Sequence, residues 1–275
     1  MALAAFELSS IGGPWARRLA PRRAWIDELP WDAPLPDDVH EAHGARAVWT
    51  RTAFSEYASA AAFAEIAAAL LAAGAPLELI AAAGDFVVDE LVHTEAAARV
   101  AAALGGAVAL EVDLAKLCRP AEAGHPLLRA AELIVRTSCV GEALTVPMLR
   151  LSRALSGSAL VEAALSHVLR DEAAHSQLGW WFLDLAEPRL DEEDRAQLGR
   201  VAGAALRAFT PLLGGSCTRS GLGAVACDRY DPALVEAAQR NVAEPLAARG
   251  IEVPAADLAA LAGHGSPLED RAGGA

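Results

Sequence analysis

The chain is poor in aromatic residues and in cysteines. Aromatic residues make up 5% of its 275 residues, whereas apolar residues, chiefly Ala and Leu, make up 54%. That balance favours helices over strands. The four cysteines are Cys118, Cys139, Cys217 and Cys227. None of them forms a Cys-x-x-Cys pair, so we expect free thiols, with a disulfide between Cys217 and Cys227 as the alternative.

Excess basic charge and long apolar runs are also missing. The net charge is -13 and the pI is about 5.0, which argues against binding to nucleic acid or to an anionic membrane surface. No apolar run approaches the roughly 20 residues of a membrane span, and the first residues lack the basic start of a signal peptide. We therefore expect a cytoplasmic protein with no nucleic-acid or membrane partner.

The apolar periodicity and the helix breakers predict an all-α fold. Four long helices are expected between residues 45 and 186, at 45–73, 76–104, 126–155 and 159–186. The first two helices and the last two are each joined by a short turn, which makes them antiparallel neighbours. The long link at 107–125 joins the two pairs, so the sequence predicts a four-helix bundle with one long crossover between helices two and three.

An N-terminal arm at residues 1–44 precedes this bundle. It contains several prolines and shows no long apolar period, so we expect irregular structure. Its tryptophans, Trp15, Trp25 and Trp31, need an outside surface to bury against, which predicts that the arm packs on the bundle.

A helical extension at residues 187–261 follows the bundle. Two helices are expected in it, near 191–209 and 231–249, and residues 262–275 are expected to form a disordered tail. The helix near 231–249 has an apolar stripe that needs a partner. We expect the arm and the extension to cover the bundle, which predicts a monomer or homodimer and not a shell of many subunits.

The most informative pattern occurs twice, as Asp89-Glu90-x-x-His93 and Asp171-Glu172-x-x-His175. Residues three apart on a helix lie about 60° apart around its axis, so the carboxylate and the imidazole of each copy can reach one metal ion. One such copy is commonly a solvated helix face, but two copies on two long helices of one bundle indicate a shared metal site.

The second hairpin supplies a further carboxylate at the depth of its motif. Depth follows from the helix rise of about 1.5 Å per residue, counted from the turn. Glu142 lies 15 residues before the turn at Gly157, and Glu172 lies 15 residues after it. Glu142 is the only charge between Thr137 and Leu149, and a lone buried carboxylate is costly unless it is paired or binds metal.

The first hairpin offers two candidates for the matching carboxylate. Glu90 lies 15 residues after the turn at Ala75, whereas Glu56 and Glu65 lie 19 and 10 residues before it. Glu56 matches the level of the motif, and Glu65 is too shallow and points about 180° away from Glu56. We assign Glu56 to the site and Glu65 to the solvent face.

Each motif glutamate follows an aspartate. A histidine that binds metal usually donates its other N–H to a carboxylate, which fixes its tautomer. In a bundle with approximate twofold symmetry, Asp171 can hold His93 and Asp89 can hold His175. The alternative is that both aspartates are surface residues.

The ordered set Glu56, Glu90-x-x-His93, Glu142 and Glu172-x-x-His175 resembles the six-ligand motif of the ferritin-like di-iron carboxylate superfamily, over roughly residues 45–186. Local strings such as Cys139-Val-Gly-Glu142 look like uncharacterised bacterial ferritin-like domain proteins. The resemblance implies two iron ions, with manganese or a mixed pair as alternatives, held by the four glutamates and the two histidines. It also implies dioxygen chemistry in which the four glutamates take part.

Departures from that family narrow the prediction. Ala97 stands where family radical generators carry a tyrosine, no Cys-x-x-Cys iron centre is present, and the additions outside the bundle argue against a ferritin cage. The p-aminobenzoate N-oxygenase type has an extra histidine at the position of Val168. Here His167 lies one residue away, so it is a ligand only if a π-bulge turns it inward; a packed histidine is the alternative.

Helix three contains Pro147, which removes the hydrogen bond to the carbonyl of Ala143 and should kink the helix. The kink is either tolerated without a role or opens the bundle beside the site for a substrate. In the second case Thr145, near Glu142, faces the oxygen-binding side.

Together these patterns predict a non-haem di-iron oxidase or oxygenase. It would use dioxygen and an unknown electron donor to oxidise an unidentified small organic substrate. The alternative functions are a ferroxidase or iron-binding protein without an organic substrate, and a protein that holds another metal pair or has lost activity.

Overall fold

The computed structural model describes residues 3–35, 39–117, 124–209, 222–223 and 227–264; for 39–41, 227–230 and 262–264 it describes the backbone alone. Long helices dominate these residues, and the predicted all-α class is confirmed. The one sheet in this part of the chain pairs two two-residue strands.

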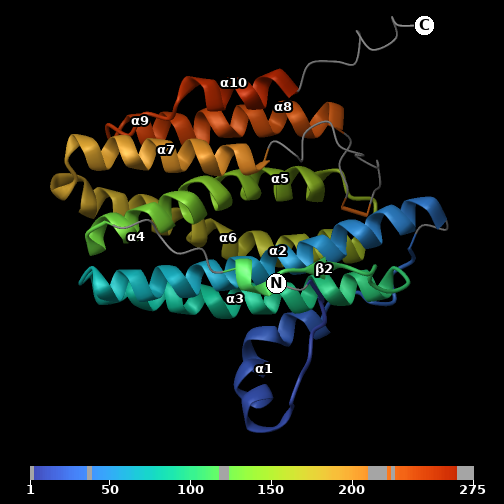
Figure 1. The fold of residues 1–275 in the computed structure, drawn as a ribbon. Coiled ribbons are helices and arrows are strands. Elements are labelled where there is room, and N and C mark those ends of the chain that lie inside the picture. The colour runs from blue at the N-terminus through green and yellow to red at the C-terminus, as the bar shows by residue number, and fades with distance from the viewer. Residues whose placement is uncertain (1–2, 36–38, 118–123, 210–221, 224–226, 265–275) are drawn as a thin grey trace, which may run out of the picture.

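Two helical hairpins form the centre of the molecule (Figure 1). In the first, α2 (Val39–Ala72) and α3 (Leu77–Ala103) meet at a turn where Gly74 has a φ of +65°, a conformation that favours glycine. In the second, α4 (Pro126–Ile134), the π-helical segment η2 (Val135–Glu142) and α5 (Ala143–Ala154) follow one another without a break. They lead into α6 (Ala159–Ala186), whose N-terminus is capped by Ser158.

The two hairpins pack on each other through α3 and α6 and through α2 and α4. A buried cluster joins them, with Phe63 and Ile66 from α2, Leu133 and Leu144 from the second hairpin, and Leu178 from α6. The crossover between the hairpins contains β2 (Glu111–Val112) and the short helix η1 (Leu114–Lys116).

The C-terminal helices form a further layer against the second hairpin. After η3 (Glu187–Arg189) this layer consists of α7 (Glu192–Phe209), α8 (Cys227–Ala237), η5 (Ala238–Ala243), α9 (Glu244–Ala247) and α10 (Ala255–His264). Here α7 contacts η2, and α8 contacts α5. Leu198, Leu234 and Leu246 from this layer belong to the same buried cluster as the hairpins, so the layer shares their core.

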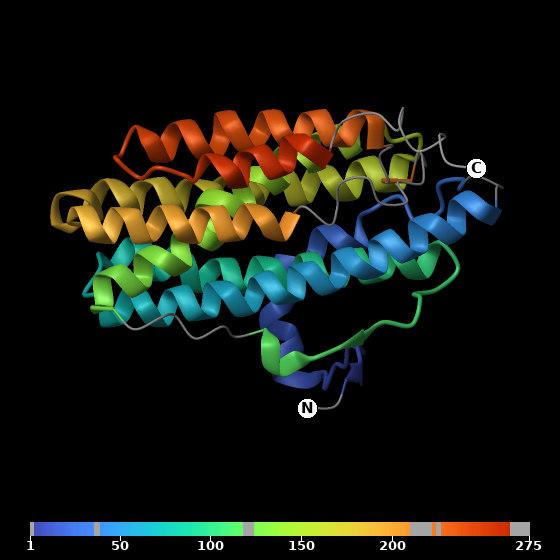
Figure 2. The same cartoon turned by 45° about the horizontal axis from the view of Figure 1, so that its top comes forward.

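The N-terminal segment contains order that the sequence did not predict. Residues Gly13–Asp27 form helix α1, and β1 (Ala4–Ala5) pairs antiparallel with β2. A glycine–proline start signals this helix, but Pro21 within it argues against a continuous helix in a prediction from sequence. Helix α1 packs against α3, on the opposite side of the molecule from the C-terminal layer (Figures 1 and 2).

The three tryptophans of this segment behave differently. Trp15 is 64% exposed, so the prediction that it packs on the bundle is wrong. Trp25 stacks on His167 of α6, with ring centroids 4.6 Å apart. Trp31 packs beside a second buried cluster, and its indole N–H donates to the carbonyl of Ile26 at 2.8 Å.

Several boundaries also differ from the sequence prediction. Helix α2 begins at Val39, inside the expected arm, and α10 was not expected. Residues 262–264, assigned to a disordered tail, lie in α10. The candidate disulfide between Cys217 and Cys227 is not tested, because Cys217 and the side chain of Cys227 lie outside the described part of the chain, as do residues 265–275 of the tail.

Judged by length and composition alone, the part of helix α2 over Ala42–Ala72 is long and apolar enough to cross a membrane. About a third of its most apolar window is buried in the structure. Because a core helix of a soluble protein passes the same test, this finding is weak support for a membrane span.

Proline and glycine shape the helix that faces α6. Because Pro147 lacks an N–H, the carbonyl of Ala143 has no helical donor, and the side-chain amide of Asn241 in η5 donates to it at 3.5 Å. Gly179 of α6 lies directly against η2, since a Cβ atom there would be 2.6 Å from the sulfur of Cys139. The π-helical segment and α6 therefore meet at closer range than any side chain on residue 179 allows.

This contact predicts the effect of a small substitution. Gly179→Ala should lower the free energy of unfolding by about 1–3 kcal/mol, because the added methyl group overpacks a fully buried contact. Urea unfolding of the metal-free protein measures the change. Gly84→Ala on α3 is the control: a Cβ there meets nothing within 4 Å, and the protein should gain about 0.5–1 kcal/mol. Equal effects of the two substitutions would contradict the close contact.

Candidate metal centre

The structure brings the six predicted ligand residues together inside the helical hairpins. They are supplied by α2 (Glu56), α3 (Glu90, His93), the last residue of η2 (Glu142) and α6 (Glu172, His175). Each of the six is 8% exposed or less. Six ionisable side chains from four helical segments thus share one interior site.

The six residues form two overlapping groups of four. Glu56, Glu90, His93 and Glu172 make the first group, and Glu90, Glu142, Glu172 and His175 make the second. In each group the four ligand atoms lie within 4.8 Å of one another. Glu90 and Glu172 belong to both groups, so each can bridge two ions. Each group also has one glutamate and one histidine that the other group lacks. We name these pairs the His93 subsite (Glu56, His93) and the His175 subsite (Glu142, His175).

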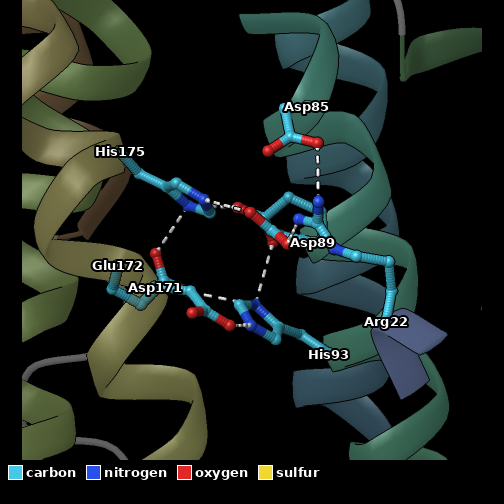
Figure 3. Close-up of polar contacts among 8 residues, drawn as sticks. Arg22, Asp85, Asp89, His93, Asp171, Glu172 and His175 are labelled. Atoms are coloured by element: carbon cyan, nitrogen blue, oxygen red, sulfur yellow. Dashed lines mark hydrogen bonds and ion pairs between the residues drawn. The ribbon is translucent and has the colours of Figure 1, made fainter. Parts of the chain in front are cut away.

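Both histidines present the same ring nitrogen to the shared carboxylates. Nδ1 of His93 lies 3.3 Å from Glu172 Oε1, and Nδ1 of His175 lies 2.9 Å from Glu172 Oε2. Nδ1 of His175 is also 3.1 Å from Glu90 Oε1. Figure 3 shows the two rings reaching toward Glu172 from opposite helices. Glu90 Oε2 lies 3.8 Å from Nδ1 of His93, so each of the two shared glutamates has one carboxylate oxygen near each histidine.

Buried polar atoms without a well-formed hydrogen bond concentrate here. They include both carboxylate oxygens of Glu90, Oε2 of Glu172, and Nδ1 of His93 and of His175. Buried polar groups in folded proteins are almost always satisfied, and these atoms converge on one site. Carboxylate and imidazole donors suit Fe²⁺, Mn²⁺ and other first-row divalent ions, so the residues fit a metal pair.

The carboxylates behave as a crowded group of like charges. Burial, followed by repulsion from Glu90 and Glu172, raises the pKa of Glu56 and of Glu142 well above the usual range for a glutamate. Burial also acts to raise the pKa of Glu172, but its contacts with the two histidines outweigh burial and hold its pKa below the usual range. Four ionised carboxylates are tolerated here only if cations neutralise them.

The histidines show the opposite balance. Burial acts to lower the pKa of His175, but contacts with Asp89, Glu172 and Glu90 outweigh it and raise the pKa to about 12. For His93, burial is likewise outweighed by contacts with Asp171 and Glu172, and its pKa lies well above the usual range. Without metal, the two imidazoles therefore supply positive charge to the site.

The two motif aspartates lie beside the histidines of the facing helices. Nε2 of His93 is 3.2 Å from Asp171 Oδ2, and Nε2 of His175 is 3.7 Å from Asp89 Oδ2. The first distance is that of a hydrogen bond, whereas the second is too long for one. Asp171 is thus placed to accept the Nε2 proton that His93 carries when its Nδ1 binds metal. Asp89 lies within ion-pair distance of the corresponding nitrogen of His175.

Three other residues singled out in the sequence lie elsewhere. Glu65 is outside both groups; it is only partly exposed and its carboxylate lies 3.8 Å from the guanidinium of Arg136, so it does not face solvent freely. His167 is half-buried against Trp25 and belongs to neither group. Thr145 is half-buried on α5, three residues after Glu142.

Sequence reasoning missed two features that shape the site. The π-helical segment η2 ends at Glu142, and it was not predicted because no residue type marks a π-turn. The rings of Phe63 and Phe86 contact His175, with centroids 5.1 and 4.2 Å from the imidazole. Both phenylalanines are buried, and they close the His175 subsite against water on that side.

The aspartates give a direct test of the histidine geometry. Asp171→Ala should weaken divalent-metal binding by roughly 10–100-fold, because His93 loses the acceptor that fixes its tautomer. Equilibrium dialysis against Mn²⁺ measures the change. Asp184→Ala is the control, since Asp184 lies on the same helix but pairs with Arg249 at the surface. Affinities that match for wild type, Asp171→Ala and Asp184→Ala would make Asp171 a surface residue only.

The pKa shifts predict proton release on metal binding. Near neutral pH the raised pKa values leave both histidines protonated, and Glu56 and Glu142 resist ionisation. Metal ligands must be deprotonated, so affinity should fall as the pH falls. Calorimetric titration with Mn²⁺ in buffers of different ionisation enthalpy should show net release of protons to the buffer. Heats that do not depend on the buffer would show that no protons are displaced.

No family model, curated protein or solved structure matches this chain. The interpretation of the site therefore depends on its own geometry.

Proposed function

We propose that the protein holds a pair of iron ions and uses dioxygen to oxidise a small organic molecule. The observation that carries this proposal is the pair of four-residue groups that share Glu90 and Glu172. Four carboxylates carry a charge of about -4, which two divalent ions neutralise. A single divalent ion would neutralise only two of the four carboxylates when all four are ionised.

The order of elements supports a ferritin-like arrangement as part of this proposal. Two hairpins joined by one long connection carry Glu, Glu-x-x-His, Glu and Glu-x-x-His in turn, the pattern known from di-iron and di-manganese carboxylate bundles. When bound, a ferrous pair supplies the electrons that reduce dioxygen. The same donor set also accepts manganese, so the native metal is part of what the experiment must determine.

The residues of the chain have distinct roles in this proposal. Glu90 and Glu172, which belong to both groups, would hold both ions, while Glu56 and Glu142 would each hold one. The histidines fix the ends of the site through Nδ1. Phe63 and Phe86 exclude water beside His175, which strengthens every charge interaction within the site.

The C-terminal layer favours an organic substrate over simple iron oxidation. Helices α7 and α8 cover the outer side of η2 and α5, so this surface is not free to build a shell of subunits. The helix beneath that cover carries both the π-segment and Pro147 next to Glu142, and such irregularities favour functional sites. A ferroxidase without an organic substrate is the alternative.

Metal stoichiometry combined with oxygen reactivity tests the proposal. The anaerobic protein should bind two Fe²⁺ ions per chain and change its visible absorbance when mixed with dioxygen. Glu142→Ala should lose one of the two iron ions, and with it the absorbance change, because it removes the carboxylate of the His175 subsite. Glu65→Ala is the matched control, since Glu65 lies on the bundle but outside both ligand groups. Full iron content in Glu142→Ala would contradict the site assignment.

The reaction with dioxygen also separates the two candidate functions. An oxygenase should form an absorbing species whose decay accelerates when compounds of one chemical class are added, with incorporation or dehydrogenation detected in the product. A ferroxidase should turn over further Fe²⁺ at a rate that organic compounds leave unchanged.

A further inference from the structure

The two motif aspartates differ in what holds them. Asp89 is 14% exposed and contacts Arg22 of helix α1, whereas Asp171 is 35% exposed. Among the residues that the structure describes, no arginine of α1 pairs with Asp171. The arrangement around the two subsites is therefore asymmetric, although the six ligands themselves are nearly symmetric.

Arg22 binds two carboxylates of α3 at once. Its Nη1 lies 2.7 Å from Asp85 Oδ1, and its Nη2 donates to Asp89 Oδ1 (Figure 3). Asp85 and Asp89 are four residues apart on one helix, where two like charges repel each other. The planar guanidinium can satisfy both carboxylates with a fixed fork geometry, so it removes this repulsion and sets the plane of the Asp89 carboxylate.

The second oxygen of Asp89 faces the metal site. While Oδ1 accepts from Arg22, Oδ2 lies 3.7 Å from Nε2 of His175. The side chain of His175 has no surface exposure, and its Nδ1 points at Glu172 and Glu90. A chain of contacts thus runs from the partly exposed Arg22 through Asp89 to one ligand of the site.

Helix α1 makes other contacts that do not reach the ligands. Arg23 pairs with Glu95 of α3, and Asp27 pairs with Arg99. Trp25 stacks on His167 of α6. These contacts pack α1 against α3 and α6 without touching Arg22, Asp89 or either motif histidine.

We propose that Arg22 is a positioning residue for the His175 subsite. By holding Asp89 it orients His175, so metal binding at the His175 subsite depends on helix α1, whereas binding at the His93 subsite does not. This inference rests on the proposed metal pair. It makes the two ions inequivalent: loss of the α1 contact loosens one ion and leaves the other in place.

Single-subsite variants provide the test, with Mn²⁺ binding as the readout. His93→Ala leaves the His175 subsite, and His175→Ala leaves the His93 subsite. Adding Arg22→Ala should weaken Mn²⁺ binding about tenfold in the His93→Ala protein, the low end of the effect of losing an outer-shell partner. In the His175→Ala protein it should leave the affinity unchanged within about twofold, the usual spread for residues that do not interact.

Two further variants separate positioning from general stability. Arg23→Ala removes a neighbouring ion pair between α1 and α3, and it should leave Mn²⁺ affinity unchanged in both backgrounds. Arg22→Lys keeps the positive charge but loses the fork, so it should restore only part of the affinity. Thermal unfolding of the metal-free proteins should give midpoints within about 4 °C of each other, because Arg22→Ala loses two partly exposed ion pairs and Arg23→Ala loses one, and each such pair contributes about 0–1 kcal/mol.

The outcomes distinguish this inference from the proposed function. If the single-subsite variants bind too weakly to measure, the two stepwise Mn²⁺ constants of the otherwise unchanged protein replace them, and Arg22→Ala should lower only one. Equal losses in both backgrounds, or equal effects of Arg22→Ala and Arg23→Ala, overturn the role of Arg22. Two bound ions with no effect of Arg22→Ala refute this inference alone. A wild-type protein that binds no metal refutes the proposed function and this inference together.

Discussion

The main constraint on this fold is that it buries four carboxylates, which repel one another when ionised. Four carboxylates from four helical segments meet in an interior from which water is largely excluded, and isolated ions in such a place cost several kcal/mol each. In the absence of metal, the raised pKa values of Glu56 and Glu142 favour their neutral forms, those of His93 and His175 favour their charged forms, and both effects reduce that cost. A pair of divalent ions would neutralise the site more completely. The energetic need for cations and the proposed chemistry therefore have the same origin.

The remaining parts of the fold can be understood as support for that site. Hydrophobic side chains from the hairpins and from the C-terminal layer form one buried cluster, which holds the helices rigidly enough to keep the ligands converged. Phenylalanine rings contact one histidine, and aspartates from facing helices contact both. Helix α1 adds a contact on one side only, so an almost symmetric set of ligands lies in asymmetric surroundings.

Much of this arrangement could be predicted because it depends on regular helices. Counting residues from the turns at Ala75 and Gly157 placed Glu56, rather than Glu65, with the other ligands, since a straight helix converts sequence distance into depth. The repeated Asp–Glu–x–x–His string also indicated which aspartate faces which histidine. Those arguments need only helix periodicity and an antiparallel pairing of the hairpins.

The features that escaped prediction depend on contacts between distant segments. The π-helical segment that ends at Glu142 is a shift in backbone hydrogen bonding, and it contains no proline that would have marked an irregularity. Arg22 looked like one of several arginines in an irregular arm, because its partners on α3 lie more than sixty residues away. Trp15 was expected to be buried and is exposed, since an aromatic residue alone does not reveal whether a surface lies within its reach.

Anomalous diffraction at the iron absorption edge, from crystals of the protein loaded anaerobically with Fe²⁺, tests the central claim most directly. The account predicts two anomalous peaks per chain, about 3.5–4 Å apart as in other two-metal sites, with Glu90 and Glu172 between them and one histidine at each. A single peak, or peaks bound outside these six residues, would contradict it.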